Sequence, residues 1–227
     1  MVRIVQKCPL MDYRRRKFLE AAILGGGLAL IGCAKKRKEE AEVTPGEDLM
    51  QEHGVVERVL LIYDEAARRI DQREALDLGV LVGACGVVRR FVQDYHEKSE
   101  ERFVFPKLEG ANRLRDLVAT LRRQHQRGRE LTDAIERLAR GGSASPDLAQ
   151  AMRSFERMYR PHAAREDTEL FPAYRELLSD SEYRELGEKF EEEEHQRFGE
   201  HGFEKIVAEV GRLEAALAIE DLAKFTP

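Results

Sequence analysis

Two near-copies of one eleven-residue phrase place histidine and glutamate where they could hold a metal ion together. The phrase HEKSEERFVFP begins at position 96, and HAAREDTELFP begins at position 162. In each copy a glutamate follows the histidine by four residues, which gives the pairs His96–Glu100 and His162–Glu166. Four residues are about one helical turn, so the two side chains of a pair stack on one helix face. An imidazole and a carboxylate stacked in this way can bind one cation.

Each phrase has a further histidine upstream, with a leucine one turn before it. His53 follows Leu49 ahead of the first copy, and His125 follows Leu121 ahead of the second. The chain therefore reads His…His-x3-Glu written twice, with the two phrases 66 residues apart (162 − 96). An internal repeat decides the architecture, and this one indicates two similar helical halves.

The composition suits long amphipathic helices and argues against a nucleic-acid partner. Charged residues make up 36% of the 227 positions, hydrophobic residues make up 42%, and the formal net charge is −5. A net negative charge without a basic patch does not favour nucleic acid. Of the 3 cysteines only Cys85 falls within the expected helical body, so no disulfide framework is expected there.

The first 33 residues have the layout of an export signal. A twin-arginine pattern, RRRKFL from position 14, precedes an apolar stretch that is too short for an ordinary membrane helix. The stretch ends in Leu-Ile-Gly-Cys33, which resembles a bacterial lipobox. We therefore predict an exported, periplasmic or cell-envelope protein that is lipidated at Cys33 and anchored to a membrane. An uncleaved membrane anchor is the alternative, and residues 34–46 should form a charged tether.

From residue 47 onward, hydrophobic positions alternate three and four apart, which predicts an all-α protein. We expect an up-down four-helix bundle over 47–178, with a C-terminal helix and tail over 179–227 packed on it. The prolines that close the two phrases, Pro106 and Pro172, should end their helices. The expected helices begin near residue 47, cover roughly 74–104 and 112–140, begin again at 146, and cover roughly 180–215.

The repeated histidines and glutamates fall on the core stripes of these helices, where an unpartnered ionisable group costs on the order of several kcal/mol. A set of them in one bundle core is best explained by bound cations. Imidazole and carboxylate without thiolate suit iron, manganese or zinc. A ferritin-like site would need paired Glu-x-x-His motifs, and the one such string ends at His195 on the wrong helix. The candidate ligands are His53, His96, Glu100, His125, His162 and Glu166.

These residues make the chain, over about 47–178, resemble the hemerythrin-like, or HHE cation-binding, family. The resemblance implies an up-down four-helix bundle around two non-haem iron ions joined by an oxo or hydroxo bridge. It also implies that the four histidines are terminal ligands and that Glu100 and Glu166 bridge the irons.

Two features depart from the oxygen-carrying members of that family. Those members have a second histidine one turn after the ligand that corresponds to His125, and here that position is Arg129. They also end with His-x4-Asp, whereas this chain has His162-x3-Glu166. The resemblance therefore implies a site that is poorer in histidine and has more open or water-filled positions.

Two further residues are candidate additional ligands. Glu97 adjoins His96, and some family members use a carboxylate there, but Ala163 takes its place in the second copy. His195 would join the pocket if the C-terminal helix covered the open end of the bundle, although an exposed acidic helix face is the simpler interpretation of its surroundings.

The resemblance implies a di-iron protein that handles oxygen, nitric oxide or peroxide, and the open positions favour peroxide-reactive redox chemistry. One alternative is a protein that binds or senses oxygen or nitric oxide without turnover. Another is an iron store or donor. A sensor or a redox enzyme of this kind would need a separate redox or output partner protein.

Overall fold

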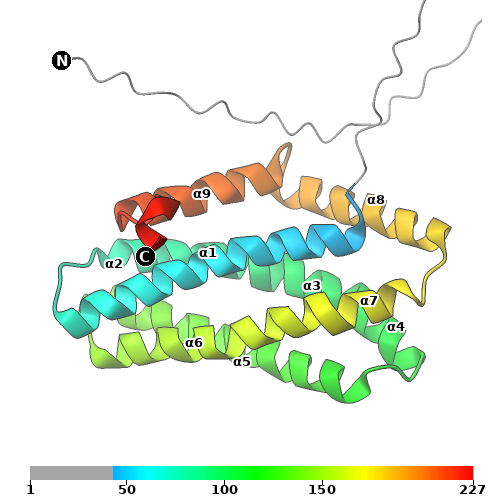
Figure 1. Ribbon diagram of the computed structural model, residues 1–227, viewed down its shortest axis with the longest axis horizontal. Coiled ribbons are helices and arrows are strands. Elements are labelled where there is room, and N and C mark those ends of the chain that lie inside the picture. The colour runs from blue at the N-terminus through cyan, green and yellow to red at the C-terminus, as the bar shows by residue number, and fades with distance from the viewer. Residues whose placement is uncertain (1–42, 227) are drawn as a thin grey trace, which may run out of the picture. The chain divides into compact units, whose positions relative to one another are not determined.

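The computed structural model describes residues 43–226, and the predicted all-α architecture is confirmed within that range. Four long helices lie side by side and alternate in direction, joined by short connections (Figure 1). α1 (Pro45–Gln72) is the first, and α5 (Arg115–Arg140) is the third. The second joins α2 (Leu78–Val87), η1 (Val88–His96), α3 (Glu97–Ser99), η2 (Glu100–Val104) and α4 (Phe105–Gly110). The fourth joins α6 (Pro146–Arg165), η3 (Glu166–Leu170) and α7 (Phe171–Arg175).

Local sequence explains where these helices begin. The Thr44 hydroxyl accepts a hydrogen bond from the Glu47 N–H, and the Glu47 carboxylate accepts one from the Thr44 N–H. This capping box starts α1 at Pro45, two residues before the expected start. Asp77 caps α2 and Ser145 caps α6 in a similar way, since their side chains accept from N–H groups of the first turn.

The phrase-closing prolines do not end their helices, which corrects that prediction. The chain stays helical through Pro106 in α4 and through Pro172 in α7. Just before each proline lies a π-helical turn, in which the Phe105 or Phe171 N–H bonds the carbonyl five residues back. The proline then opens an α-helical turn, where a missing N–H costs little. Both π turns begin at a repeated glutamate, and such turns are frequent at functional sites.

The C-terminal region forms two helices rather than the single one expected. They are α8 (Asp180–Phe198) and α9 (Gly202–Ala216), and the short 3-10 helix η4 (Leu222–Phe225) follows. The break lies at Gly199 and His201, whose φ values of 73° and 58° are left-handed and cannot continue a helix. α9 packs on α1 and α2, and α8 packs on α1 (Figure 1).

Two hydrophobic clusters fill the bundle on either side of a polar layer. One includes Leu60, Phe91, Ile135 and Phe155, and the other includes Phe105, Leu121, Leu170 and Phe190. Along the bundle helices the repeated histidines and glutamates lie where the residues of one cluster give way to those of the other. The polar layer is therefore enclosed by apolar packing above and below.

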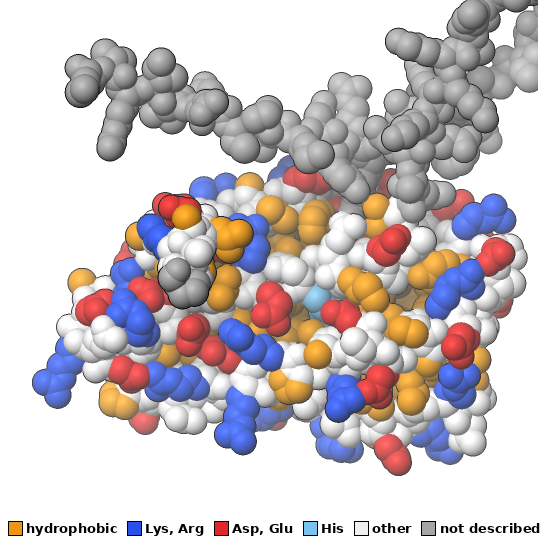
Figure 2. All heavy atoms as spheres, viewed as in Figure 1, with side chains coloured by type: hydrophobic (Ala, Val, Ile, Leu, Met, Phe, Trp, Pro, Cys, Tyr) orange, Lys and Arg blue, Asp and Glu red, His pale blue; other side chains and the backbone are white. Residues whose placement is uncertain are grey.

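The outer surface is mixed in charge. On the face drawn in Figure 2, acidic and basic side chains are interspersed among hydrophobic ones. None of the described helices has both the length and the apolar character needed to cross a membrane. The predicted export signal, the lipidation site Cys33 and most of the tether lie outside the described residues.

Candidate metal centre

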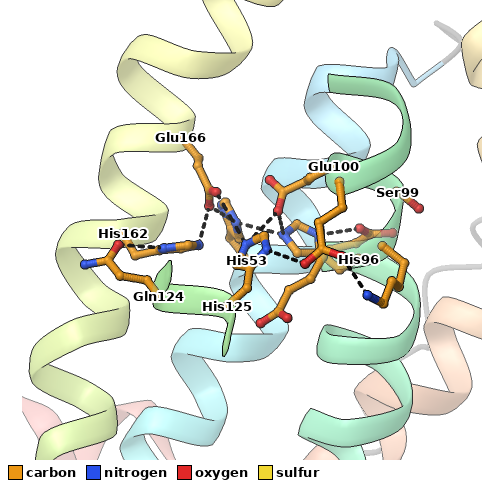
Figure 3. Close-up of polar contacts among 12 residues, drawn as sticks. His53, His96, Ser99, Glu100, Gln124, His125, His162 and Glu166 are labelled. Atoms are coloured by element: carbon orange, nitrogen blue, oxygen red, sulfur yellow. Dashed lines mark hydrogen bonds and ion pairs between the residues drawn. The ribbon is translucent and has the colours of Figure 1, made fainter. Parts of the chain in front are cut away.

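The bundle brings the whole candidate ligand set together in the polar layer (Figure 3). The histidines come from one helix each, and the glutamates begin the π turns of the second and fourth helices. Every one of these side chains is buried, with a residue exposure of 3% or less. The set comprises His53, His96, Glu100, His125, His162 and Glu166.

Glu166 faces histidines from three helices. Its Oε2 lies 3.3 Å from Nε2 of His53 and 3.1 Å from Nε2 of His162. Its other oxygen, Oε1, lies 4.0 Å from Nε2 of His125. One carboxylate therefore reaches histidines of both halves of the repeat.

Glu100 takes the matching position on the second helix. Its Oε2 lies 3.4 Å from Nε2 of His125 and 3.8 Å from Nε2 of His96. The Nε2 atoms of His96 and His53 are 3.0 Å apart. Two ligand atoms that bind one ion at about 2.1 Å lie about 3.0–3.4 Å apart in octahedral or tetrahedral geometry. The 3.0 Å and 3.4 Å spacings therefore suit shared cations.

Most of the ligand atoms that face this space lack a hydrogen bond within the described part of the chain. Both oxygens of Glu100 and of Glu166, and the Nε2 atoms of His125 and His162, are buried and have no hydrogen-bond partner there. Buried polar atoms are almost always satisfied, because leaving one unsatisfied costs free energy. A cation would satisfy all of them at once, so the residues fit a metal.

The ligands form two overlapping groups, each with its ligand atoms within 4.8 Å of one another. The first cation group is His53, His96, Glu100 and Glu166, and the second cation group is Glu100, His125, His162 and Glu166. Because Glu100 and Glu166 belong to both, they can bridge two neighbouring ions. The structure thus brings the six candidate residues together in two groups that share Glu100 and Glu166.

The outward nitrogen of each imidazole meets an acceptor. These Nδ1 contacts are His53–Asp167 at 2.8 Å, His96–Glu52 at 2.7 Å, His125–Glu101 at 3.1 Å and His162–Gln124 at 3.0 Å. An acceptor at Nδ1 holds the ring proton on that side and leaves the Nε2 lone pair free for a metal.

Sequence reasoning missed these four acceptors, although the repeat carried a signal for them. Each is the chain neighbour of a ligand, and each has a counterpart in the other half. Glu52 and Gln124 precede the first histidine of their halves, whereas Glu101 and Asp167 follow the two shared glutamates.

Glu97 lies beside the second cation group and is fully buried. Its Oε2 accepts a hydrogen bond from Arg129 at 2.7 Å, and its Oε1 has no partner among the described residues. With Glu101 and His125 it forms a third set of atoms within 4.8 Å of one another. Burial raises the pKa of Glu97 to about 8 against the opposing attraction of Arg129. The structure therefore keeps Glu97 as a candidate additional ligand.

Arg129 lies next to the candidate metal site but cannot be a metal ligand. Its guanidinium bonds Glu97 and also Glu101, at 2.9 Å, and a guanidinium has no lone pair to give a metal. It instead holds two carboxylates next to His125.

His195 is not brought to the centre. It is exposed on α8 and belongs to none of the three groups formed by the described residues. The preceding residue, Glu194, is buried instead, because one step along a helix rotates the side-chain direction by about 100°.

The pKa values of the groups in this polar layer reflect two effects, burial and the charges of neighbouring groups. Burial lowers the pKa of His96 to about 3 and that of His125 to about 4. Burial also works to lower the pKa of His53, but Asp167 and Glu166 outweigh it and raise the pKa to about 9. Burial and the nearby Glu166 raise the pKa of Glu100 well above its usual range. Cations would remove this conflict, because they favour neutral imidazole and ionised carboxylate.

The fold is an all-α bundle, and its core holds two candidate ligand groups that share two carboxylates. Together these features define a class of cation-binding four-helix proteins. The family described as the hemerythrin HHE cation binding domain matches residues 44–174. The chain therefore belongs to this family.

Relatives in two mycobacteria share the length of the chain. Uncharacterized protein Rv1995 of Mycobacterium tuberculosis (strain ATCC 25618 / H37Rv) and Uncharacterized protein Mb2018 of Mycobacterium bovis (strain ATCC BAA-935 / AF2122/97) are each 42% identical over 244 aligned positions. The alignments cover 100% of this chain and 96% of each relative. No solved structure gives a significant match.

Proposed function

We propose that this protein is a non-haem di-iron protein that handles a small ligand through peroxide-reactive redox chemistry. The observation that carries the proposal is the pair of overlapping ligand groups that share Glu100 and Glu166. A single structural ion would need one group of about four ligands. Two groups with common carboxylates support a pair of ions side by side.

The donor set supports iron. It consists of imidazole nitrogen and carboxylate oxygen without thiolate, which suits iron and also manganese or zinc. When bound, two irons exchange electrons with oxygen or peroxide, which no side chain of this layer can do. The chain's own residues hold the ions and fix the histidine rings through their Nδ1 partners. The two hydrophobic clusters limit the entry of water.

The proposed reactivity follows from what surrounds the four ligands of the second cation group. The turn after His125 supplies Arg129, which is bonded to two carboxylates, and Gly128 leaves space beside it. A cation held there would keep a position that a small molecule can occupy.

The test is anaerobic reconstitution with ferrous iron, followed by iron analysis and optical spectra before and after oxygen and peroxide. We expect about two irons per chain, rapid oxidation and measurable peroxide consumption. An oxygen adduct that persists and releases intact oxygen under vacuum would instead support a carrier or sensor. Iron released to a chelator without any reaction with peroxide would support a store or donor. One tightly held zinc and no iron would end the di-iron proposal.

A matched pair of histidine variants tests the ligand set. His162→Ala should lose iron, because it removes a group that faces Glu166 at 3.1 Å. His195→Ala should keep full iron content, because His195 is exposed on α8. The opposite pattern would show that the ligand set is wrong.

We further propose that the protein is exported and anchored to a membrane by a lipid on Cys33, and that it exchanges electrons with a separate redox protein. Support comes from the twin-arginine pattern and the lipobox-like ending before Cys33. Cys33→Ser should abolish lipid labelling and release the protein from membranes or block its processing. Wild-type protein found in the cytoplasm with residues 1–33 intact would contradict the anchor.

A further inference from the structure

Tyr159 is a buried phenol that packs beside His162 of the second cation group. The residue is 1% exposed, and its OH has no hydrogen-bond partner among the described residues. Its ring centroid lies 5.0 Å from that of His162 and 5.2 Å from that of Phe155. A buried tyrosine OH normally finds a partner, so this one indicates a place where a partner binds.

The second unsatisfied group on this side of the centre is Oε1 of Glu97. It is buried and has no partner within the described chain, while the other oxygen of that carboxylate is bonded to Arg129. The Tyr159 ring stacks on Phe155, and Cε2 of Phe155 lies 3.9 Å from the point where a Cβ on Gly128 would stand. Glu97 Oε1 lies 3.9 Å from the same point, so the phenol and the carboxylate lie on either side of this glycine.

A glycine leaves room between these groups. A Cβ placed on Gly128 would come within 3.6 Å of Met158 Cε and within 3.9 Å of both Glu97 Oε1 and Phe155 Cε2. These are ordinary contact distances, so Gly128 leaves about one methyl group of space beside Glu97. We name the space bordered by Gly128, Glu97 and Tyr159 the polar recess.

The first half of the bundle does not repeat this arrangement. By the spacing of the two phrases, Gln93 stands where the second half has Tyr159, and Ala163 stands where the first half has Glu97. The amide of Gln93 is satisfied, since its Nε2 donates to Thr132 Oγ1 at 2.8 Å. The polar recess is therefore confined to the side of the second cation group.

We propose that the polar recess is the binding site of the exogenous small molecule, with the Tyr159 hydroxyl donating to it and Glu97 Oε1 accepting from it. The inference rests on the proposed di-iron function and narrows its ligand class. A molecule that satisfies both groups must accept and also donate hydrogen bonds. Hydrogen peroxide does both, whereas dioxygen and nitric oxide only accept and would leave Glu97 Oε1 unsatisfied.

The probe is azide, an anion that accepts hydrogen bonds and donates none, titrated optically into the iron-loaded full chain. Tyr159→Phe keeps the ring that packs on His162 and removes only the hydroxyl. We expect the azide Kd to rise roughly tenfold, as for loss of one hydrogen bond to a charged group. The KM for peroxide should rise in the same variant.

Glu97→Gln gives the opposite response to the two molecules. In the iron-loaded protein the cations favour the ionised form of Glu97, so an amide removes a negative charge next to azide and the azide Kd should fall. Peroxide loses a charged acceptor, so its KM should rise. A structural role for Glu97 would not move the two constants in opposite directions.

Tyr63→Phe is the matched control, because Tyr63 is equally buried and its hydroxyl contacts Cys85 Sγ at 3.5 Å. It should leave the azide Kd unchanged. In metal-free protein, Tyr159→Phe should leave the melting temperature unchanged or raise it, since an unsatisfied hydroxyl is removed. A lower melting temperature, or an unchanged azide Kd with full iron content, would overturn this inference alone. Wild-type protein that binds no iron would overturn both it and the proposed function.

Discussion

The two halves of the bundle repeat one ligand plan but surround it differently. In the first cation group the outward nitrogens of both histidines meet carboxylates, Glu52 for His96 and Asp167 for His53. In the second, His162 meets the neutral amide of Gln124. A carboxylate at Nδ1 makes the imidazole a stronger ligand than an amide does. We therefore expect the first cation to be held more tightly.

The second cation group has the open side. His125 shares its acceptor Glu101 with Arg129, and the polar recess lies next to it. The first half is also covered from outside, because α9 packs on α1 and α2. From this difference we expect the duplicated ligands to serve two purposes, with one ion held firmly and the other open to a small molecule.

The largest expected effect comes from removing a residue that the two halves share. Glu100→Gln should weaken iron binding by more than about 100-fold at both positions, because the carboxylate faces histidines of both cation groups. The metal-free variant should be as stable as the wild type or more stable, since burial already raises the pKa of Glu100. Iron analysis and thermal unfolding measure the two effects.

The control is Glu130→Gln, which changes an exposed glutamate on α5. It should keep two irons. Loss of only one iron from Glu100→Gln would show that this residue does not bridge.

Exchanging the carboxylate and amide acceptors at Nδ1 tests whether the two irons are held with different affinity. Glu52→Gln gives His96 the kind of acceptor that His162 has, and it should weaken one of the two irons by about 10- to 100-fold. Gln124→Glu should strengthen the other. The measurement is the rate and amount of iron released to a competing chelator. Equal release of both irons in wild type and in both variants would remove the proposed difference between the halves.

Filling the polar recess should separate stability from ligand binding. Gly128→Ala places a methyl group at contact distance from Met158 and Glu97, and alanine favours a helix over glycine by about 0.5–1 kcal/mol. We expect a more stable protein that binds azide less well. Gly54→Ala is the control, since a Cβ there meets no described atom within 4 Å. It should give the same gain in stability with unchanged azide binding.

The last effect, which appears only at high pH, concerns a glutamate on α6. Burial raises the pKa of Glu156 to about 7 from an ordinary value of 4.5. Between these values the unfolded chain binds fewer protons than the folded one, so stability falls as pH rises. Glu156→Gln should therefore raise the free energy of unfolding by about 1 kcal/mol at pH 8, after allowance for partial exposure, and change it little near pH 5. Denaturant unfolding at the two pH values tests this, and an equal gain at both would contradict the assignment.

That the six candidate ligands meet in the core could be predicted, because helical periodicity limits where they can lie. His96 and Glu100 are one turn apart on one helix, and the second copy repeats them, so both pairs had to face the same core. The partners that accept hydrogen bonds from the histidine Nδ1 atoms could not be predicted in this way. Whether Glu52 reaches His96 on another helix depends on the rotation and spacing of the two helices, which periodicity leaves open.

The two errors in helix boundaries have a similar origin. Pro106 was expected to end a helix, but the π turn before it changes the hydrogen-bond pattern so that its missing N–H does little harm. Gly199 stood in the middle of a long charged helix pattern, where a single glycine is ordinarily tolerated. Its left-handed conformation, followed by that of His201, breaks the helix instead.

Mössbauer spectroscopy of protein loaded with iron-57 tests the central claim most directly, because it counts distinct iron environments and shows which of them a ligand changes. With elemental analysis, the account predicts about two irons per chain in two unequal environments, of which azide shifts one. The shifted environment should be the one that Gln124→Glu alters and Glu52→Gln leaves alone. A single iron per chain, or two irons that respond equally to azide, would contradict a centre with one firmly held ion and one open to a small ligand.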